Sequence, residues 1–169
     1  MSNFDSTKKY PVIVYVYGGP HAQMITNSFL DGANLWMYWM AEQGYLVFTV
    51  DNRGSDNRGF AFESVIHGKL GVNEMDDQLK GVDYLKSLPY VDANRLAVHG
   101  WSFGGFMASL AITKGADVFK MAIAVAPVTN WRYYDNIYTE RFMRTPKENE
   151  DGYDRNSPIN FVDQIKGKY

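Results

Sequence analysis

One serine in this chain stands in a setting that could make it a nucleophile. Ser102 is the centre of the pattern Gly-x-Ser-x-Gly, which is completed by Gly100, Trp101, Phe103 and Gly104. A serine hydroxyl attacks an acyl carbon best where it stands exposed on a tight turn, within reach of a base. Glycines permit such a turn because they carry no side chain that would collide. The pattern predicts a nucleophilic serine; the alternative is a glycine-rich turn whose serine only caps a helix.

The segments on either side of Ser102 are those that the nucleophile interpretation requires. Residues 96–99 form an apolar run that predicts a buried strand, and apolar residues at helical spacing follow from Met107 to Gly115. In a strand–turn–helix, the backbone N–H of Phe103 lies at the N-terminus of the helix. Unpaired donors and the helix dipole favour a developing negative charge there, so we expect this N–H to form part of an oxyanion hole.

The composition is that of an ordinary globular domain, and it excludes several kinds of site. Of the 169 residues, 46% are hydrophobic and 21% are charged, and the net charge of −2 makes nucleic acid and anionic membranes poor partners. The absence of cysteine excludes a disulfide scaffold, a thiolate zinc site and a cysteine nucleophile. No apolar run is long enough to span a bilayer, and the first residues lack a signal-peptide core. We expect neither a cofactor nor a metal.

Alternating strands and helices must position the serine. Continuous β-branched or apolar runs predict strands at 12–17, 45–50, 96–99 and 121–125. Helical patterns lie at 32–43, at 73–88, between Gly105 and Gly115, and at 157–166. This alternation predicts the α/β class, with a mainly parallel sheet and helices on both faces. Residues 59–72 show no clear pattern.

The helix ends carry their own signals. Asn73 can cap the helix that ends before Pro89, with Asp76 three residues later as its partner in a capping box. Gly44, Gly115 and Gly167 follow the other helical patterns, and we expect them to end those helices.

Four loops are expected at the edge of the sheet where ligands bind. They follow the four predicted strands, at Tyr17–Pro20, Asp51–Ser55, Gly100–Gly104 and Ala126–Tyr138. The last loop holds Trp131, Tyr133, Tyr134 and Tyr138. Aromatic side chains at this edge predict an apolar pocket for a substrate side chain, or a lid or subunit contact.

The position of the histidines argues against a complete catalytic triad. In α/β-hydrolases the carboxylate and the histidine base both follow the serine in the chain. The three histidines, His21, His67 and His99, all precede Ser102. His99 lies within a predicted strand and is expected to be a hydrogen-bonded core residue. His67 has no evident carboxylate partner. His21 follows the Gly-Gly-Pro turn and could line the site, but as the base it would break the usual chain order.

Several motifs together resemble a known family. They are Tyr17-Gly-Gly-Pro20, Asp51-x-Arg-Gly-Ser55, Gly100-Trp-Ser-Phe-Gly-Gly105 and the segment Trp131–Arg141. Their order and spacing, from about Tyr10 to about Tyr153, resemble the catalytic domain of the prolyl oligopeptidase family of serine peptidases. The last motif resembles the dipeptidyl peptidase IV branch in particular.

The resemblance implies a role for each candidate residue. Ser102 would be the nucleophile, and the oxyanion would be held by the Phe103 N–H and by the hydroxyl of Tyr17. The pocket for a proline side chain would be walled by four residues: Val128, Trp131, Tyr134 and Tyr138. Such peptidases release dipeptides from the N-terminus of peptides with proline, less often alanine, in the second position. A flat aromatic box suits the rigid apolar ring of proline.

The same resemblance also implies what is missing. Residues 1–169 would be a partial, truncated α/β-hydrolase catalytic domain without the triad Asp and His and without the family's β-propeller, and would be inactive alone. Phe103 stands where the dipeptidyl peptidase IV branch often has tyrosine. An acylaminoacyl- or tripeptidyl-type peptidase, an esterase, or a non-catalytic association module stay open as alternatives. The resemblance implies an exported, periplasmic or membrane-associated parent protein.

Truncation has a structural consequence. The fold places the four strands in the order second, first, third, fourth, so both outer strands would lack their neighbours. Unpaired edges and uncovered apolar surface favour pairing between chains. We therefore expect the isolated chain to self-associate.

Overall fold

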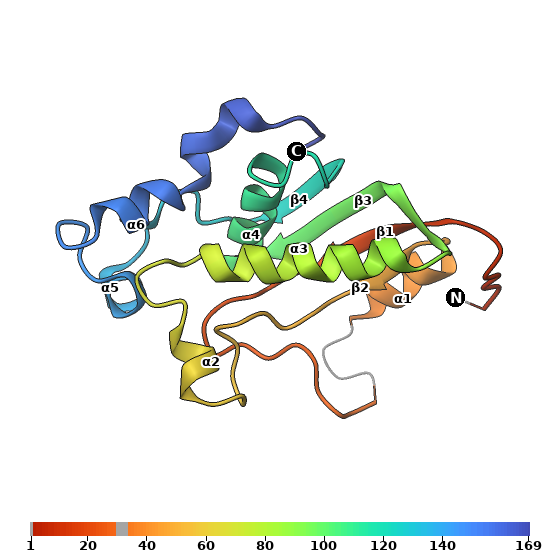
Figure 1. Cartoon of the computed structure of the whole chain (residues 1–169), viewed down its shortest axis with the longest axis horizontal. Helices are drawn as coiled ribbons and strands as arrows, with labels where there is room; N and C mark the ends of the chain where they lie inside the picture. Colours follow the sequence, from red (N-terminus) through yellow and green to blue (C-terminus); the bar gives the residue numbers. More distant parts are fainter. Residues whose placement is uncertain (1, 30–33) are drawn as a thin grey trace.

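The computed structural model describes residues 2–29 and 34–169, and within them four parallel strands form one sheet (Figure 1). The strands are β1 (Tyr10–Tyr15), β2 (Leu46–Phe48), β3 (Val91–Trp101) and β4 (Met121–Val125). Their order across the sheet is β2-β1-β3-β4, as expected. All three pairings are parallel, so the carboxyl ends of the four strands lie together at the same end of the sheet.

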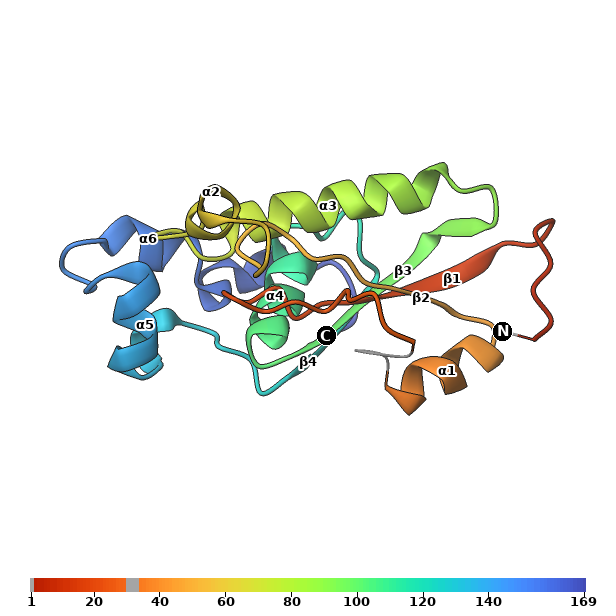
Figure 2. The ribbon, with the colours of Figure 1, turned by 90° about the horizontal axis from the view of Figure 1, so that it is seen from below.

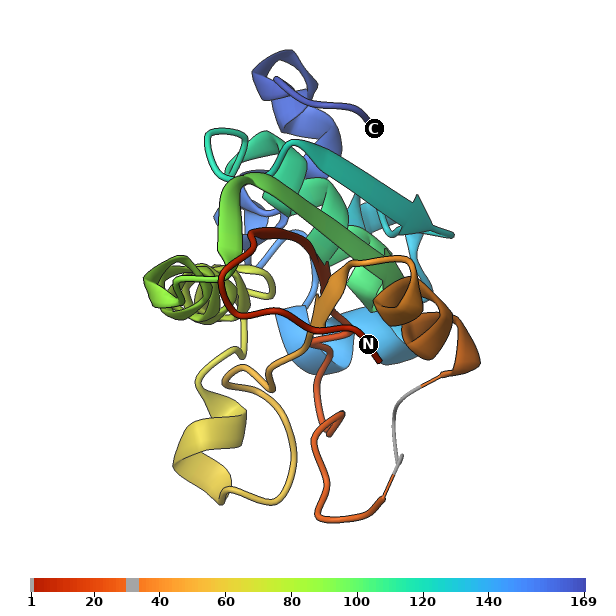
Figure 3. The same cartoon turned by 90° about the vertical axis from the view of Figure 1, so that its right-hand side faces the viewer.

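Helices lie on both faces of this sheet. They are α1 (Leu35–Glu42), α2 (Phe60–Ser64), α3 (Val72–Ser87), α4 (Phe103–Thr113), α5 (Asn136–Met143) and α6 (Glu150–Arg155), with 3₁₀ turns η1 (Trp131–Tyr133) and η2 (Pro158–Gln164). Figures 2 and 3 show α3 on one face of the sheet and α1 on the other. The α/β class predicted from the alternation is confirmed. No helix in the described part of the chain is both long and apolar enough to cross a membrane.

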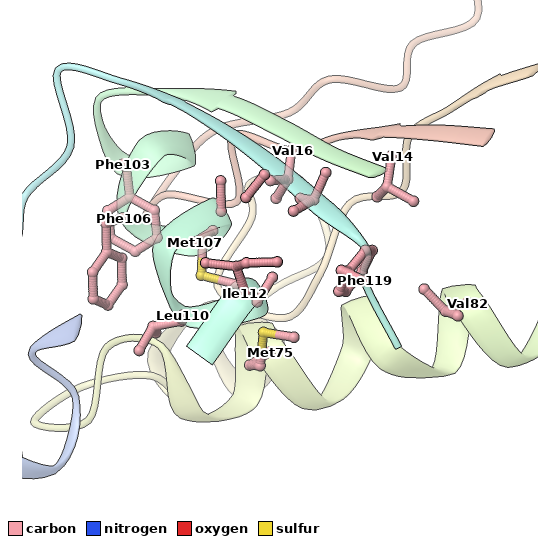
Figure 4. Close-up of a cluster of buried hydrophobic side chains, with 14 of the residues drawn as sticks. Val14, Val16, Met75, Val82, Phe103, Phe106, Met107, Leu110, Ile112 and Phe119 are labelled. Carbon is pink, nitrogen blue, oxygen red and sulfur yellow. The ribbon is translucent and has the colours of Figure 1, made fainter. Parts of the chain in front are cut away.

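The core lies between the sheet and the helices α3 and α4 (Figure 4). Val12, Val14 and Val16 alternate along β1 and its extension, and all three side chains are buried. Every residue of α4 is buried, because the helix packs against β3, β4 and η2. This burial fixes the start of α4, where Ser102 stands.

The strand limits differ from the sequence prediction at their ends. The ladder of β1 begins at Tyr10 because Tyr10 N–H donates to Tyr90 O at 2.8 Å. β2 is confined to three residues and is one of the two outer strands of the described sheet, paired with β1. β3 extends beyond the predicted 96–99 at both ends. The predicted helix start at Gly32 lies outside the described residues, and α1 begins at Leu35.

The predicted cap of α3 is wrong by two residues. The N-cap is Gly71, whose φ of 91° suits glycine, and Asn73 is a buried residue of the first turn. The partner in the box is Glu74, whose Oε2 accepts the Gly71 N–H at 3.0 Å, instead of Asp76. The first turn is buried at Asn73 and Glu74, which places Glu74 against the Gly71 N–H, whereas Asp76 is exposed.

Candidate active site

Ser102 stands on a strained turn between β3 and α4. Its backbone angles are φ 56° and ψ −113°, a conformation that residues other than glycine rarely adopt. The turn is possible because two glycines lie against backbone: a Cβ on Gly100 would lie 2.2 Å from Gly104 O, and one on Gly104 would lie 2.1 Å from Val16 O. The sharp strand-to-helix turn predicted from the motif is therefore present.

Hydrogen bonds hold this turn against its neighbours. Ser102 N–H donates to Val125 O at the end of β4, at 2.9 Å, and Ser102 O accepts the Phe106 N–H at 3.0 Å. Phe103 is the first residue of α4, so its N–H has no acceptor within the helix. This N–H is available for an anion beside Ser102.

The residues singled out in the sequence line one small cavity. Its volume is about 30 Å³. Its walls consist of seven side chains from three separate segments: Tyr17, Ser102, Phe103, Val128, Trp131, Tyr134 and Tyr138. The structure thus brings together every candidate nucleophile, oxyanion and pocket residue.

Aromatic rings make up most of the cavity wall. Tyr134 and Tyr138 meet edge to face, with ring centroids 5.4 Å apart and an interplanar angle of 86°. Trp131 is buried, packs against both rings and also contacts Phe103, at 5.7 Å between ring centroids. Tyr133 is 79% exposed and does not line the cavity, unlike the other aromatic residues of its loop.

Two polar side chains shape the loop that carries these rings. Asn130 Oδ1 accepts the Arg132 N–H at 2.9 Å and caps η1. Asp135 Oδ1 accepts the Tyr138 N–H at 2.8 Å and caps α5. Capping by Asn or Asp is a signal that the sequence carries, although the crowding of aromatic residues in this loop obscures it.

Two phenols of the cavity, Tyr17 and Tyr138, are held in their protonated form. Burial raises the pKa of Tyr17, and the neighbouring Tyr134 raises it further. Burial raises the pKa of Tyr138 more strongly, with smaller contributions from Tyr17 and Tyr134. Both hydroxyls can therefore donate hydrogen bonds throughout the neutral range.

No histidine lines the Ser102 cavity within the described part of the chain. The half-buried His99 lies in β3, and its Nδ1 is 3.0 Å from Ile123 O. His21 pairs with Glu63, and both line a separate cavity of about 530 Å³ that His67 also lines. Within residues 2–29 and 34–169, no group of three or more His, Asp or Glu side chains could hold a metal ion.

The Asp51–Ser55 motif has a structural role in this chain. Asp51 accepts the N–H groups of Met24 and Ile25 at 2.7 and 3.0 Å. Arg53 binds Asp77 of α3 through its Nε and a terminal nitrogen, the latter at 2.7 Å. The Arg53–Asp77 contacts anchor the loop on α3, and the Asp51 contacts join it to residues 24–25. Their partners lie 24 to 27 residues away, so no local pattern could have indicated them.

Comparison with known proteins agrees with the geometry of this site. Residues 33–169 match the model of the prolyl oligopeptidase family. The chain is 49% identical over 153 residues to the protein named "Probable dipeptidyl-aminopeptidase B" of Paracoccidioides lutzii, and 44% identical over 147 residues to human dipeptidyl peptidase 8. These matches cover 90% and 86% of this chain, but only 17% and 16% of the relatives.

Solved structures give the same result. A Bacteroides ovatus protein described as a dipeptidyl aminopeptidase IV superposes with a TM-score of 0.96 and 52% identity, over 98% of this chain and 24% of the other. Dipeptidyl peptidase 4 of Porphyromonas gingivalis superposes with a TM-score of 0.90 and 43% identity, over 97% and 23%. The present chain thus spans about a quarter of these solved chains. It has an α/β-hydrolase fold, and it belongs to the prolyl oligopeptidase family.

Proposed function

We propose that residues 1–169 are part of the catalytic domain of a serine exopeptidase. The full-length protein would release dipeptides from the N-terminus of peptides that carry proline, or alanine, in the second position. The observation that supports this proposal most is the single cavity in which Ser102 meets an aromatic box. The names of the similar proteins cited above, which are those of dipeptidyl peptidases or dipeptidyl aminopeptidases, support it further.

The proposed reaction is an acyl transfer in two steps. Ser102 Oγ attacks the carbonyl carbon of the proline residue, while a general base takes the hydroxyl proton. The C–N bond then breaks, the leaving amine takes that proton, and the dipeptide stays attached to Ser102 as an ester. Water hydrolyses the ester, which releases the dipeptide and restores the serine.

Two donors would stabilise the negative charge that develops on the carbonyl oxygen. One is the Phe103 N–H at the start of α4, and the other is the Tyr17 hydroxyl, whose raised pKa keeps its proton in place. Donors that are held in position before the reaction contribute about 3 kcal/mol each to transition-state stabilisation. The rings of Trp131, Tyr134 and Tyr138 would enclose the proline ring.

We also propose that the 169-residue chain is inactive by itself. The cavity needs a base, and none of its seven lining side chains is a histidine or a carboxylate. His21 pairs with Glu63, and both line another cavity, so His21 does not supply the base. The base and its carboxylate would come from another part of the full-length protein.

Arylamide cleavage tests the proposed activity. The full-length protein is assayed with Gly-Pro-arylamide, Gly-Gly-Pro-arylamide, an N-acetyl-alanyl arylamide and a simple ester, beside its Ser102→Ala variant. We expect Gly-Pro-arylamide to be preferred and its cleavage to depend on Ser102. Preference for one of the other three substrates would instead indicate a tripeptidyl peptidase, an acylaminoacyl peptidase or an esterase. Cleavage of none of them would favour a non-catalytic association module.

A further inference from the structure

Asn52 lies buried in the loop after β2, with a side chain that is fully used in hydrogen bonds. It is 1% exposed. Its Nδ2 donates to Gly18 O at 3.0 Å and to Arg53 O at 2.7 Å, and its Oδ1 accepts from Gln78 Nε2 at 3.1 Å. A buried amide with two donors and an acceptor in use fixes the groups that it contacts.

The Gly18 carbonyl is the contact that matters for the site, because Gly18 directly follows Tyr17. Gly18 adopts φ 73°, and a Cβ on it would lie 2.7 Å from Asn52 Oδ1. The backbone here is therefore pressed directly against the Asn52 side chain. Close by, His21 N–H donates to Gly54 O at 3.0 Å, so the same two loops are joined at a second point.

Tyr17 is held from its other side by the start of α4. Its Cα would lie 3.1 Å from a Cβ on Gly104, and its ring centroid lies 6.2 Å from that of Phe103. Tyr17 thus stands between a helix that carries the nucleophile and a loop that is anchored by Asn52. Movement of either would change the direction of the phenol.

Asn52 is itself held on α3. Gln78, which is 3% exposed, donates through the same Nε2 to Val50 O at 3.1 Å. The Ser55 hydroxyl donates to Asn52 O at 2.8 Å. A line of buried contacts therefore runs from α3 through Gln78 and Asn52 to Gly18 and the residue before it.

The geometry points to Asn52 as a positioning residue that aims the Tyr17 hydroxyl at the oxyanion, through the Gly18 carbonyl. This inference rests on the proposed function of Tyr17. It assigns no chemical step to Asn52, which touches neither the cavity nor the substrate. An oxyanion donor works only within about 2.7–3.1 Å of the developing charge, so a small rotation of Tyr17 would weaken it.

The first test measures the NMR resonance and the pKa of Tyr17 in the 169-residue chain, and it does not require enzymatic activity. Tyrosine rings are labelled with ¹³C, and Tyr17 is assigned with the Tyr17→Phe variant. In Asn52→Ala we expect the Tyr17 resonance to shift and its pKa to fall toward the ordinary value of 10, because water reaches the loosened ring. The control is Asn160→Ala, whose exposed asparagine side chain donates a hydrogen bond to the carbonyl oxygen of the exposed Asp154.

An unmoved Tyr17 resonance and an unchanged Tyr17 pKa in a folded Asn52→Ala variant would overturn the inference. Asn52→Ser, which removes less volume and keeps one polar donor, is measured in the same way. An unmoved Tyr17 resonance and an unchanged Tyr17 pKa in this variant would also count against the inference. If both variants shift Tyr17 while Asn160→Ala does not, the inference holds.

The second test is a double-mutant cycle in the full-length protein with Gly-Pro-arylamide. We expect Asn52→Ala to lower kcat about tenfold with KM within about twofold, and to have less than about a twofold effect when Tyr17→Phe is also present. Equal losses of kcat in both backgrounds would show that Asn52 does not act through Tyr17. Failure of the proposed function is distinguishable, since Ser102→Ala and Tyr17→Phe would then leave cleavage unchanged while the ¹³C comparison still reports on Asn52.

Discussion

The rings of Trp131 and Tyr138 lie 6.1 Å apart and within 16° of parallel. Trp131 is 1% exposed, so it forms a buried support on which the cavity-lining Tyr138 rests. The pair joins η1 to α5, and Asp135 caps the start of that helix. The wall of the cavity is thus fixed by packing, which would lower the cost of binding a rigid ring.

Removal of the Tyr138 ring tests the role of this wall. In the full-length protein we expect Tyr138→Ala to lower kcat/KM for Gly-Pro-arylamide by at least about tenfold, since loss of a ring contact costs more than about 1.4 kcal/mol. Tyr133→Ala is the matched control, because Tyr133 belongs to the same loop but is 79% exposed. Equal effects of the two variants would contradict the assignment of Tyr138 to the pocket.

Backbone strain at Ser102 predicts an inverted order of stability. At an ordinary position, alanine is favoured over glycine by about 0.5–1 kcal/mol. At φ 56° and ψ −113° only glycine is free of strain, so Ser102→Gly should be more stable than Ser102→Ala by about 1 kcal/mol. Urea unfolding of the two variants of this chain measures the difference. A more stable Ser102→Ala variant would mean that the turn is not strained.

Buried Glu74 predicts a loss of stability as the pH rises. Burial raises its pKa from an ordinary 4.5 to about 8, so the folded chain holds a proton there that the unfolded chain releases. The free energy of unfolding should then fall between pH 4.5 and 8, by an amount on the order of a few kcal/mol, as each pKa unit is worth about 1.4 kcal/mol. Unfolding of the chain across this pH range measures the fall.

Substitutions on the same helix separate Glu74 from other carboxylates. Glu74→Gln cannot ionise, so its stability should depend less on pH than that of the parent chain. Asp76→Asn, at an exposed position two residues later, should leave the pH dependence in place. If Glu74→Gln retained the full fall, the buried carboxyl would not be its source.

The face of the sheet opposite α3 predicts self-association of this chain. Trp101, Met121 and Ile123 are 61%, 38% and 52% exposed there. We expect light scattering to show oligomers at micromolar concentration, and Ile123→Lys to shift them toward the monomer. Ile137→Lys, which replaces an 80% exposed isoleucine on α5, should have less effect. A monomeric parent chain would contradict the prediction.

Much of the fold and of the site could be predicted because its signals are local. The alternation of β-branched strands with helical patterns gave the α/β class, and the glycines around Ser102 gave the turn. The pocket residues came from the resemblance of several motifs, which together carry more information than the serine pattern alone. Val128 and Trp131 do line the cavity with Tyr134 and Tyr138.

What could not be predicted depends on contacts between distant residues. Asn52 reaches Gly18 across 34 positions, and His21 reaches Glu63 across 42. The cap at Gly71 was missed because its φ of 91° and the burial of Asn73 are set by packing, whereas the sequence offered a better capping residue nearby. Helices α2 and α6 have only five and six residues, and their patterns cover too few turns to be distinguished from loops.

Covalent trapping of the nucleophile tests the central claim most directly. The full-length protein is treated with a dipeptidyl phosphonate diaryl ester that carries a proline analogue next to phosphorus, and the adduct is located by peptide mass mapping. The account predicts one adduct, on Ser102, that is lost in Ser102→Ala and slowed in Tyr138→Ala. An adduct on another residue would contradict it, and so would labelling whose extent and rate are unchanged in both Ser102→Ala and Tyr138→Ala.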